Sequence, residues 1–183
     1  MKRRRVLMGL GATLTLAPKA LAARKKKFAS AYGGAEIIEF ETPERPGTII
    51  VDTVERVLYH VLGRETAMRY GVAVGRDGYD WAGIAAIGRK EEWRVWTPPA
   101  AMMARQPELR KFAGGMPGGP DNPLGARALY LFEGERDTLF RIHGTNEPRS
   151  IGSASSSGCI RMLNEEVSEL YDYAEIGSKV IVL

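Results

Sequence analysis

Short runs of β-branched and aliphatic residues, separated by turns rich in glycine and charge, begin at residue 47. Such runs predict β-strands, because branched apolar side chains fit a half-buried pleated surface. Three turn residues, 63–65, separate two of these runs, which is typical of a hairpin. In this part of the chain we expect strands at 48–52, 56–62, 67–74 and 84–90, and a further extended piece at 91–96.

The second part of the chain alternates between turns, strands and helical segments. A short helix is predicted from Thr97 to Arg105, since threonine can cap a helix and proline is tolerated in its first turn. A second helix is predicted over 163–174, where Asn164 is a good N-cap. Further strands are expected at 128–132, 138–142 and 179–183.

The composition agrees with a β-rich chain. Hydrophobic residues make up 44% of the 183 residues, enough for one globular core, and the 21 glycines and 10 prolines favour many turns. We therefore predict one mainly β domain at residues 47–183, with short helices.

The first 22 residues have the pattern of a secretory signal peptide. A positive region at 2–5 precedes an apolar run at 6–16 and a small-x-small cleavage pattern at 20–22. The apolar run has 11 residues, fewer than the roughly 20 that span a bilayer, so we expect no stable transmembrane anchor. A Tat or a Sec signal fits, and an uncleaved signal anchor is the alternative. We interpret 23–46 as a tether and expect the protein in the periplasm or cell envelope.

The formal net charge of +4 is concentrated at the N-terminus. Residues 1–22 carry five basic side chains and no acidic one, which leaves 21 basic against 22 acidic side chains in the rest of the chain. Because the predicted domain is slightly acidic, the basic overall balance does not indicate nucleic-acid binding.

Cys159 and His143 form a candidate catalytic pair. Cys159 is the only cysteine, and His143, 16 positions earlier, is one of two histidines. A thiol nucleophile needs a base that accepts its proton near neutral pH, and imidazole suits that role. The loop between them is rich in glycine and serine and can fold back. Gly158 permits a tight turn that aims the N–H groups of Gly158 and Cys159 at one point, as in an oxyanion hole.

A lone cysteine in an exported chain has no intramolecular partner, so it is either a buried inert thiol or a functional one. The polar flank at Ser157 favours the functional thiol. The other histidine, His60, lies within a predicted strand, and we interpret it as structural. Two histidines and one cysteine are too few for a metal site, and no cofactor is predicted.

Two other features are candidates for the walls of a site. The three tryptophans within 81–96 could line a substrate cleft, although packing in the core or at its rim is the commoner role. The glycine-rich segment 114–125 lacks the Gly-Lys-Ser/Thr ending of a phosphate loop. Its position before the strand at 128–132 indicates an active-site wall.

Several motifs together resemble the L,D-transpeptidase (YkuD-type) family. The resemblance extends from about residue 47 to residue 183 and implies an L,D-transpeptidase-like β-sandwich with a short helix after the cysteine. The chain departs from the family at Ser157, where a histidine usually precedes the motif glycine. The motifs are His143-Gly144-Thr145, Ser157-Gly158-Cys159-Ile160-Arg161-Met162, Gly-Gly-Pro-Asp-Asn-Pro-Leu-Gly at 118–125, Ala-Leu-Tyr-Leu at 128–131 and Gly-Ser-Lys-Val-Ile-Val at 177–182.

The resemblance implies roles for individual residues. Cys159 would be the nucleophile and His143 its base, with the carbonyl of Gly144 holding the imidazole. The backbone around Ser157 and Gly158 would bind the oxyanion. Arg161 matches the family's arginine after Cys-Ile and suits either a substrate carboxylate or a structural ion pair.

The substrates that the resemblance implies are peptidoglycan stem peptides. The family cuts the bond between diaminopimelate and the terminal D-alanine, and joins the acyl group to another diaminopimelate amine or to the lysine of an envelope protein. Two alternatives remain: an L,D-carboxypeptidase, in which water takes the acyl group, and a non-catalytic peptidoglycan-binding module. The departure at Ser157 is the main reason to consider the second.

Overall fold

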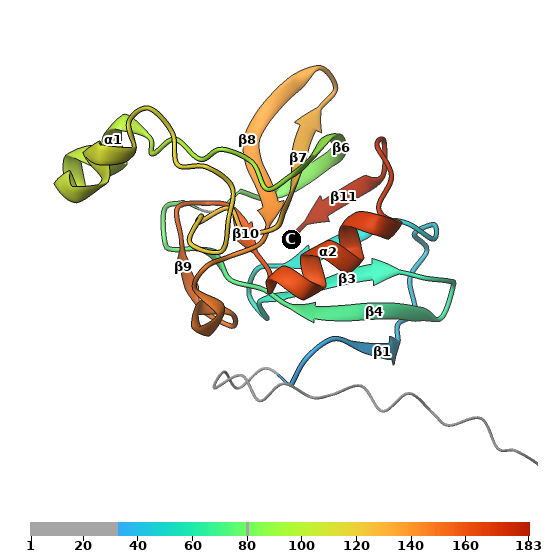
Figure 1. Ribbon diagram of the computed structural model, residues 1–183. Helices are drawn as coiled ribbons and strands as arrows, with labels where there is room; N and C mark the ends of the chain where they lie inside the picture. Colours follow the sequence, from blue (N-terminus) through green and yellow to red (C-terminus); the bar gives the residue numbers. More distant parts are fainter. Residues whose placement is uncertain (1–32, 80) are drawn as a thin grey trace, which may run out of the picture.

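The computed structural model describes residues 33–79 and 81–183 (Figure 1), and the predicted signal peptide lies outside this part of the chain. The helical elements are α1 (Ala100–Arg105), α2 (Asn164–Tyr173) and the 3₁₀ turns η1 (Pro107–Phe112) and η2 (Pro148–Ser150). The strands are β1 (Glu36–Glu39), β2 (Ile49–Asp52), β3 (Val57–Val61), β4 (Thr66–Gly71), β5 (Val74–Gly75), β6 (Gly83–Glu92), β7 (Arg127–Glu133), β8 (Arg136–His143), β9 (Ala154–Ser156), β10 (Ile160–Arg161) and β11 (Lys179–Val182).

Most strands join one nine-stranded sheet in the order β1-β4-β3-β2-β11-β6-β7-β8-β10, and β5 pairs with β9 in a separate ribbon. In Figure 1, β7 and β8 run steeply across the direction of β3 and β4, with β11 between the two groups. The expected mainly β class with short helices is confirmed. The two layers of the expected sandwich are the two halves of this sheet, because β11 pairs with β2 on one side and with β6 on the other.

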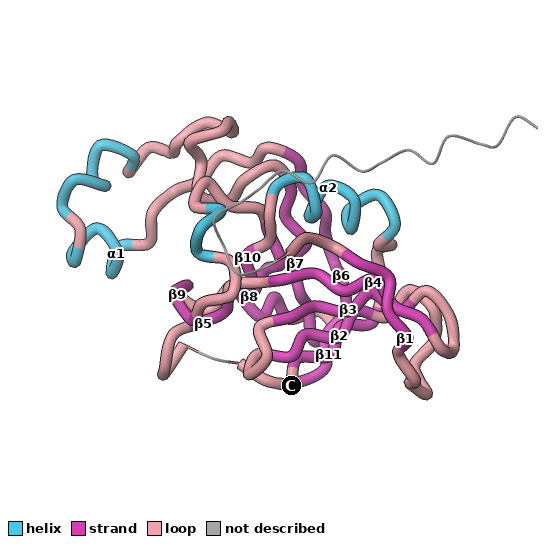
Figure 2. Tube along the Cα trace, turned by 90° about the horizontal axis from the view of Figure 1, so that it is seen from below, coloured by secondary structure: helices cyan, strands magenta, loops and turns pink. Residues whose placement is uncertain are grey.

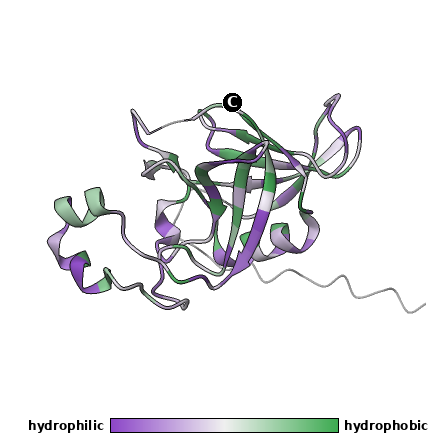
Figure 3. Cartoon of the chain, turned by 90° about the horizontal axis from the view of Figure 1, so that it is seen from above, coloured by the Kyte–Doolittle hydropathy of each residue, from purple (hydrophilic) through white to green (hydrophobic). Residues whose placement is uncertain are grey.

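One hydrophobic core unites both halves of the sheet with α2. Its members include Val51 and Leu58 from one half, Leu129 from the other, and Val167 and Leu170 from α2. Figure 3 shows hydrophobic residues gathered on the central strands and hydrophilic ones toward the loops. Since α2 buries one face against both halves, it fixes the segment that directly precedes it, which carries Cys159.

The start of α2 differs from the expectation. Leu163 is the N-cap, and Asn164 is the first helical residue. The Oδ1 of Asn164 accepts hydrogen bonds from the backbone N–H groups of Ala126 and Thr145, at 3.0 and 3.2 Å. Asn164 therefore joins the helix to two distant loops.

The segment 67–74, expected as one strand, changes partners along its length. It leaves the large sheet after Gly71, and Ala73 exchanges backbone hydrogen bonds with Arg161. β5 then pairs with β9. This change of partner brings the turn at 75–79 against the loop that carries Cys159. The extended pieces expected at 84–90 and 91–96 are instead one strand, β6, which ends before Trp93, where φ is 39°.

Residues 36–40, within the predicted tether, pack on the domain. β1 pairs antiparallel with β4, and the ring of Phe40 stacks on that of Tyr59 with centroids 4.5 Å apart. The far edge of the large sheet is therefore formed by a segment from outside the predicted domain. Among the described residues, no helix has the length and apolar character needed to cross a bilayer.

Residues 93–125, which we call the arm, project from the body of the protein (Figures 1 and 2). The predicted helix at 97–105 appears as α1, which starts after Pro99 without a side-chain cap. Pro107 begins η1, a turn that the sequence pattern did not predict. At the base of the arm, Trp96 and Met116 exchange two backbone hydrogen bonds. The buried Asn122 amide donates to the carbonyls of Arg94, Met116 and Pro117, which closes the loop.

Candidate active site

A cleft of about 630 Å³ lies between the arm and the ends of β8 and β10. His143, Cys159, Arg161 and Ser157 all line it, so the predicted side chains come together in one place. The other described lining residues are Arg76, Trp96, Pro99, Met102, Arg105, Gln106, Leu109, Met116, Asp121, Pro123, Leu124, Leu139, Asn146, Glu147, Ser155 and Ser156. The lining by Asp121, Pro123 and Leu124 agrees with the prediction that 114–125 forms a wall.

His143 is the last residue of β8 and is only 5% exposed. Its Nδ1 lies 2.6 Å from the carbonyl oxygen of Gly144. A carbonyl only accepts hydrogen bonds, so Nδ1 carries the proton and Nε2 keeps its lone pair. Burial lowers the pKa of His143 from 6.5 to about 4, although hydrogen bonding to the carbonyls of Gly144 and Leu124 favours the protonated ring. At neutral pH the imidazole is therefore uncharged and able to accept a proton.

Cys159 is half-buried and directly precedes β10. β10 runs parallel to β8 with Arg161 opposite His143, so continuing the register places Cys159 opposite Arg141. Adjacent strands lie about 4.8 Å apart and two residues rise about 6.6 Å, which puts the Cα atoms of Cys159 and His143 roughly 8 Å apart. Burial raises the pKa of the thiol, while the backbone N–H and the charge of Arg141 act in the opposite direction. The resting pair is therefore a neutral thiol beside a neutral imidazole.

The turn before Cys159 depends on glycine. Gly158 has φ 114°, and a Cβ atom there would lie 2.9 Å from the ring of Phe140 and 3.1 Å from the carbonyl oxygen of Tyr79. The buried hydroxyl of Ser156 accepts from the Gly158 N–H at 3.1 Å and donates to the Cys159 carbonyl at 2.5 Å. Within the described residues, the N–H groups of Ser157 and Cys159 form no hydrogen bond. The predicted glycine turn is present, but the Gly158 N–H is already bonded within the loop.

Arg161 forms an ion pair with Glu147, Nη1 to Oε2, at 2.9 Å. The Arg161 side chain is 20% exposed and the Glu147 side chain 65%, so the carboxylate is the easier partner to displace. The buried Nε of Arg161 has no hydrogen-bond partner within the described part of the chain. Of the two roles that the sequence left open, the ion pair is present, and the guanidinium still lines the cleft.

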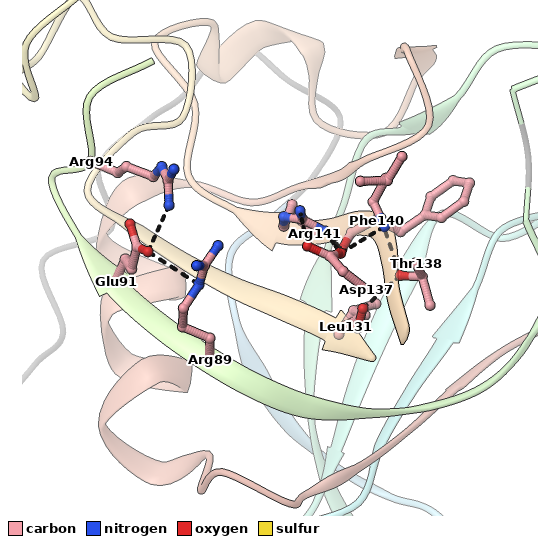
Figure 4. A network of polar contacts seen from close by, with 9 residues as sticks. Arg89, Glu91, Arg94, Leu131, Asp137, Thr138, Phe140 and Arg141 are labelled. Atoms are coloured by element: carbon pink, nitrogen blue, oxygen red, sulfur yellow. Dashed lines mark hydrogen bonds and ion pairs between the residues drawn. The ribbon is translucent and has the colours of Figure 1, made fainter. Parts of the chain in front are cut away.

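A bulge in β8 brings Leu139 into the cleft, a feature that the sequence pattern did not reveal. Leu139 has φ 66° and is 75% exposed, both uncommon for leucine. Figure 4 shows the polar contacts that hold the bulge: Thr138 Oγ1 donates to the Leu131 carbonyl at 2.7 Å and accepts from the Phe140 N–H at 3.2 Å. The run 138–142 predicts a plain strand, and the bulge is revealed by the register shift against β7 together with these side-chain hydrogen bonds.

Asp137 and Arg141 complete this network. The Arg141 guanidinium donates two hydrogen bonds to the Asp137 carboxylate, at 2.7 and 2.8 Å, and Asp137 also accepts from the Leu139 N–H at 2.8 Å (Figure 4). The ring of Phe140 stacks on Trp81 with centroids 5.3 Å apart and lies against Gly158. The bulge thereby supports the turn at Cys159 from behind.

The tryptophans divide between the two roles considered from the sequence. Trp96 lines the cleft, whereas Trp81 packs on Phe140 and Trp93 is 43% exposed. Met102 and Leu109 of the arm also line the cleft. Sequence reasoning missed them, because an apolar residue in a short predicted helix does not show whether it faces the core or a cleft. In the structure, α1 and η1 bury none of their residues.

His60 is buried, and neither ring nitrogen has a hydrogen-bond partner in the part of the chain described. Its ring stacks on Tyr173 at a centroid distance of 6.4 Å. Burial lowers the pKa of His60. These contacts agree with a structural histidine. In residues 33–79 and 81–183, no three histidine, cysteine or carboxylate side chains gather as metal ligands.

Comparison with protein families gives a match over most of the chain. A sequence model of the L,D-transpeptidase catalytic domain (YkuD) matches residues 46–182. A Salmonella typhimurium protein named probable L,D-transpeptidase ErfK/SrfK is 33% identical over 141 residues, 74% of this chain and 43% of that protein. A Fuscovulum blasticum protein named putative L,D-transpeptidase in ATP synthase subunits region ORF 5 is 41% identical over 101 residues, 55% of this chain and 49% of that protein. The chain spans a little under half the length of these relatives.

Solved structures share the same architecture. A Brucella melitensis protein described as a probable carnitine operon oxidoreductase is 48% identical, with a TM-score of 0.56 over 81% of this chain and 92% of that chain. An L,D-transpeptidase from Mycobacterium smegmatis is 17% identical, with a TM-score of 0.56 over 74% of this chain and 58% of that chain. At such low identity, the second likeness shows a common fold alone.

Proposed function

The chain belongs to the family of L,D-transpeptidase catalytic domains, and on that premise we propose that it is a cysteine-dependent L,D-transpeptidase of the cell envelope acting on peptidoglycan stem peptides. The observation that carries the proposal is that Cys159 and His143 line one cleft, with the imidazole held by the Gly144 carbonyl through Nδ1. That hydrogen bond leaves the lone pair on Nε2, which is what a base for a thiol proton requires.

The first half of the reaction forms a thioester. His143 Nε2 takes the thiol proton as Cys159 Sγ attacks the carbonyl carbon between diaminopimelate and D-alanine. A C–S bond forms, and the imidazolium then gives its proton to the departing D-alanine nitrogen as the C–N bond breaks. Because the resting thiol and imidazole are both neutral, the thiol proton has to pass to the imidazole for the sulfur to react as a thiolate.

Backbone groups beside the nucleophile stabilise the oxyanion. The Gly158 N–H is bonded to Ser156, so we assign the role to the N–H groups of Cys159 and Ser157, with Gly158 supplying the turn. This assignment needs only backbone at Ser157. The departure from the family's usual histidine there is then compatible with catalysis.

Arg161 suits recognition of a substrate carboxylate. A guanidinium binds a carboxylate through two parallel hydrogen bonds, and the Glu147 carboxylate already occupies one such position. Exchanging the exposed Glu147 for a substrate carboxylate keeps the charge of Arg161 compensated. The stem peptide, which carries free carboxylates, is a matching ligand.

In the second half of the reaction an amine attacks the thioester carbonyl, and His143 accepts the proton of that amine. A C–N bond forms as the C–S bond breaks, and the imidazolium returns the proton to the departing Cys159 thiolate. The amine belongs to a second diaminopimelate or to the lysine of an envelope protein. We place the protein in the periplasm or cell envelope because its substrates lie there and because residues 1–22 have the pattern of a signal peptide.

The test is incubation with a disaccharide-tetrapeptide followed by mass spectrometry of the products. We expect a dimer linked between two diaminopimelate residues and the release of D-alanine. Tripeptide alone would indicate an L,D-carboxypeptidase. Unchanged substrate, together with equal muropeptide binding by Cys159→Ala, would indicate a binding module. Cys159→Ala is expected to abolish turnover, and His143→Ala to lower it at least ~100-fold.

A further inference from the structure

Asn164 lies at the meeting point of three chain segments around His143. Its Oδ1 accepts from the N–H of Ala126, which precedes β7, and from the N–H of Thr145, which follows β8. Two N–H donors converge on one side-chain atom, and this identifies that atom as the amide oxygen. The first residue of α2 therefore holds both ends of the β7–β8 hairpin.

The packing at this point leaves no space for further side-chain atoms. A Cβ atom on Gly144 would lie 2.1 Å from Asn164 Oδ1, and one on Gly125 would lie 2.2 Å from it. Gly125 also has φ 63°. The two glycines let the backbone approach the amide closely enough for both hydrogen bonds.

The bond to Thr145 acts on the base through a single peptide unit. The Thr145 N–H and the Gly144 carbonyl belong to the same planar peptide. Asn164 accepts from the N–H end, and the carbonyl end accepts from His143 Nδ1 at 2.6 Å. Fixing one end of a planar unit fixes the other, and linked hydrogen bonds polarise one another.

A purely helical role does not account for this side chain. Leu163 is the N-cap of α2, and Asn164 Oδ1 accepts from the N–H groups of Ala126 and Thr145, which lie outside the helix. The backbone carbonyl of Asn164 accepts from the Ser168 hydroxyl at 2.8 Å, so the helix start has other contacts. The Asn164 amide is directed to the hairpin rather than to the N–H groups of its own helix.

We propose that Asn164 is a positioning residue for the catalytic base: through the peptide between Gly144 and Thr145 it holds His143 as the Nδ1–H tautomer, with Nε2 available to Cys159. The proposal rests on the function proposed above. It assigns a role in the reaction to a residue that the sequence pattern indicates only as a helix cap.

The experiment compares Asn164→Ala with Asn164→Asp in the full chain. Alanine removes the acceptor, whereas aspartate keeps an oxygen at the same position. Ser168→Ala is the matched control, because it removes a hydrogen bond to the same residue's backbone. The readouts are kcat and KM for transpeptidation, and the ¹⁵N shifts of the histidine ring nitrogens at pH 7. The spectrum of the His143→Gln variant shows which ring signals belong to His60, and the signals that it lacks are those of His143.

We expect Asn164→Ala to lower kcat at least roughly ten-fold with KM within about two-fold, and to give a mixture of His143 tautomers. Asn164→Asp and Ser168→Ala should keep the Nδ1–H tautomer and kcat within about three-fold of the parent chain. If Asn164→Ala does not fold, Asn164→Ser is measured with the same expectation, since its hydroxyl is too short to reach both N–H groups.

The proposal is overturned if the folded alanine or serine variant keeps a single Nδ1–H tautomer and normal kcat. It is also overturned if kcat falls equally in the alanine and aspartate variants with the tautomer unchanged, because that pattern belongs to a structural role. The ring shifts need no substrate. A parent chain without transpeptidase activity would therefore refute the proposed function, and the tautomer measurement would still decide the role of Asn164.

Discussion

The protonation of His143 makes a quantitative prediction about stability below neutral pH. Histidine in the unfolded chain titrates near 6.5, whereas burial lowers the pKa of folded His143 to about 4. Between these values the unfolded chain binds more protons than the folded one, so the free energy of unfolding falls as the pH falls. At about 1.36 kcal/mol per pKa unit, the gap from 6.5 to about 4 corresponds to about 3 kcal/mol. Well above pH 6.5 both states bind no proton at this histidine, and its pH dependence disappears.

The assay is urea unfolding of the parent chain and of His143→Gln at several pH values from 4 to 7.5. Glutamine does not titrate, so subtracting the two curves isolates His143 from other groups. We expect the free energy of unfolding of the parent chain, relative to the variant, to fall by about 3 kcal/mol from pH 7 to pH 4. A preformed thiolate–imidazolium pair would raise the folded pKa of His143 and give the opposite slope. Parallel curves, or that opposite slope, would refute the neutral pair on which the proposed mechanism depends.

Three further predictions concern single side chains. In thermal unfolding, Gly158→Ala should lower stability by about 2 kcal/mol more than Gly152→Ala. Both glycines have positive φ, but of the two only Gly158 has neighbours within 4 Å of an added Cβ. Equal losses of stability would contradict the packing argument. Arg161→Gln should raise KM at least ~10-fold, whereas Glu147→Gln should leave KM unchanged or lower it. An unchanged KM in Arg161→Gln would mean that the arginine serves only the ion pair. His60→Phe should raise the free energy of unfolding more at pH 5 than at pH 7.5. Burial lowers the pKa of His60, so protonation at low pH favours the unfolded chain, and phenylalanine removes that effect. A gain independent of pH would mean that this histidine is solvated when folded.

The sequence predicted those features that depend on neighbouring residues. Runs of branched or apolar residues predicted the strands β2, β3, β7, β8 and β11. Cys159 and His143 could be paired because the chemistry requires both and the chain offers few alternatives. Their position in one cleft follows from the parallel pairing of β10 with β8.

The features that the sequence did not predict depend on distant partners. The segment 67–74 is broken because Ala73 pairs with Arg161, which lies 88 positions later. Capping rules are local, so they predict an N-cap at Asn164 and miss its bonds to Ala126 and Thr145. The exposed leucine at 139 follows from a bulge held by side-chain hydrogen bonds, for which a strand pattern gives no signal.

The arm shapes the cleft without contributing to the hydrophobic core. α1 and η1 bury none of their residues, yet Met102 and Leu109 form part of the cleft wall. Lengthening, shortening or exchanging the arm's tip would thus remove nothing from the core and leave the thiol and its base in place. The width and lining of the cleft can therefore change through the arm alone, while the sheet and α2 that position Cys159 and His143 stay as they are.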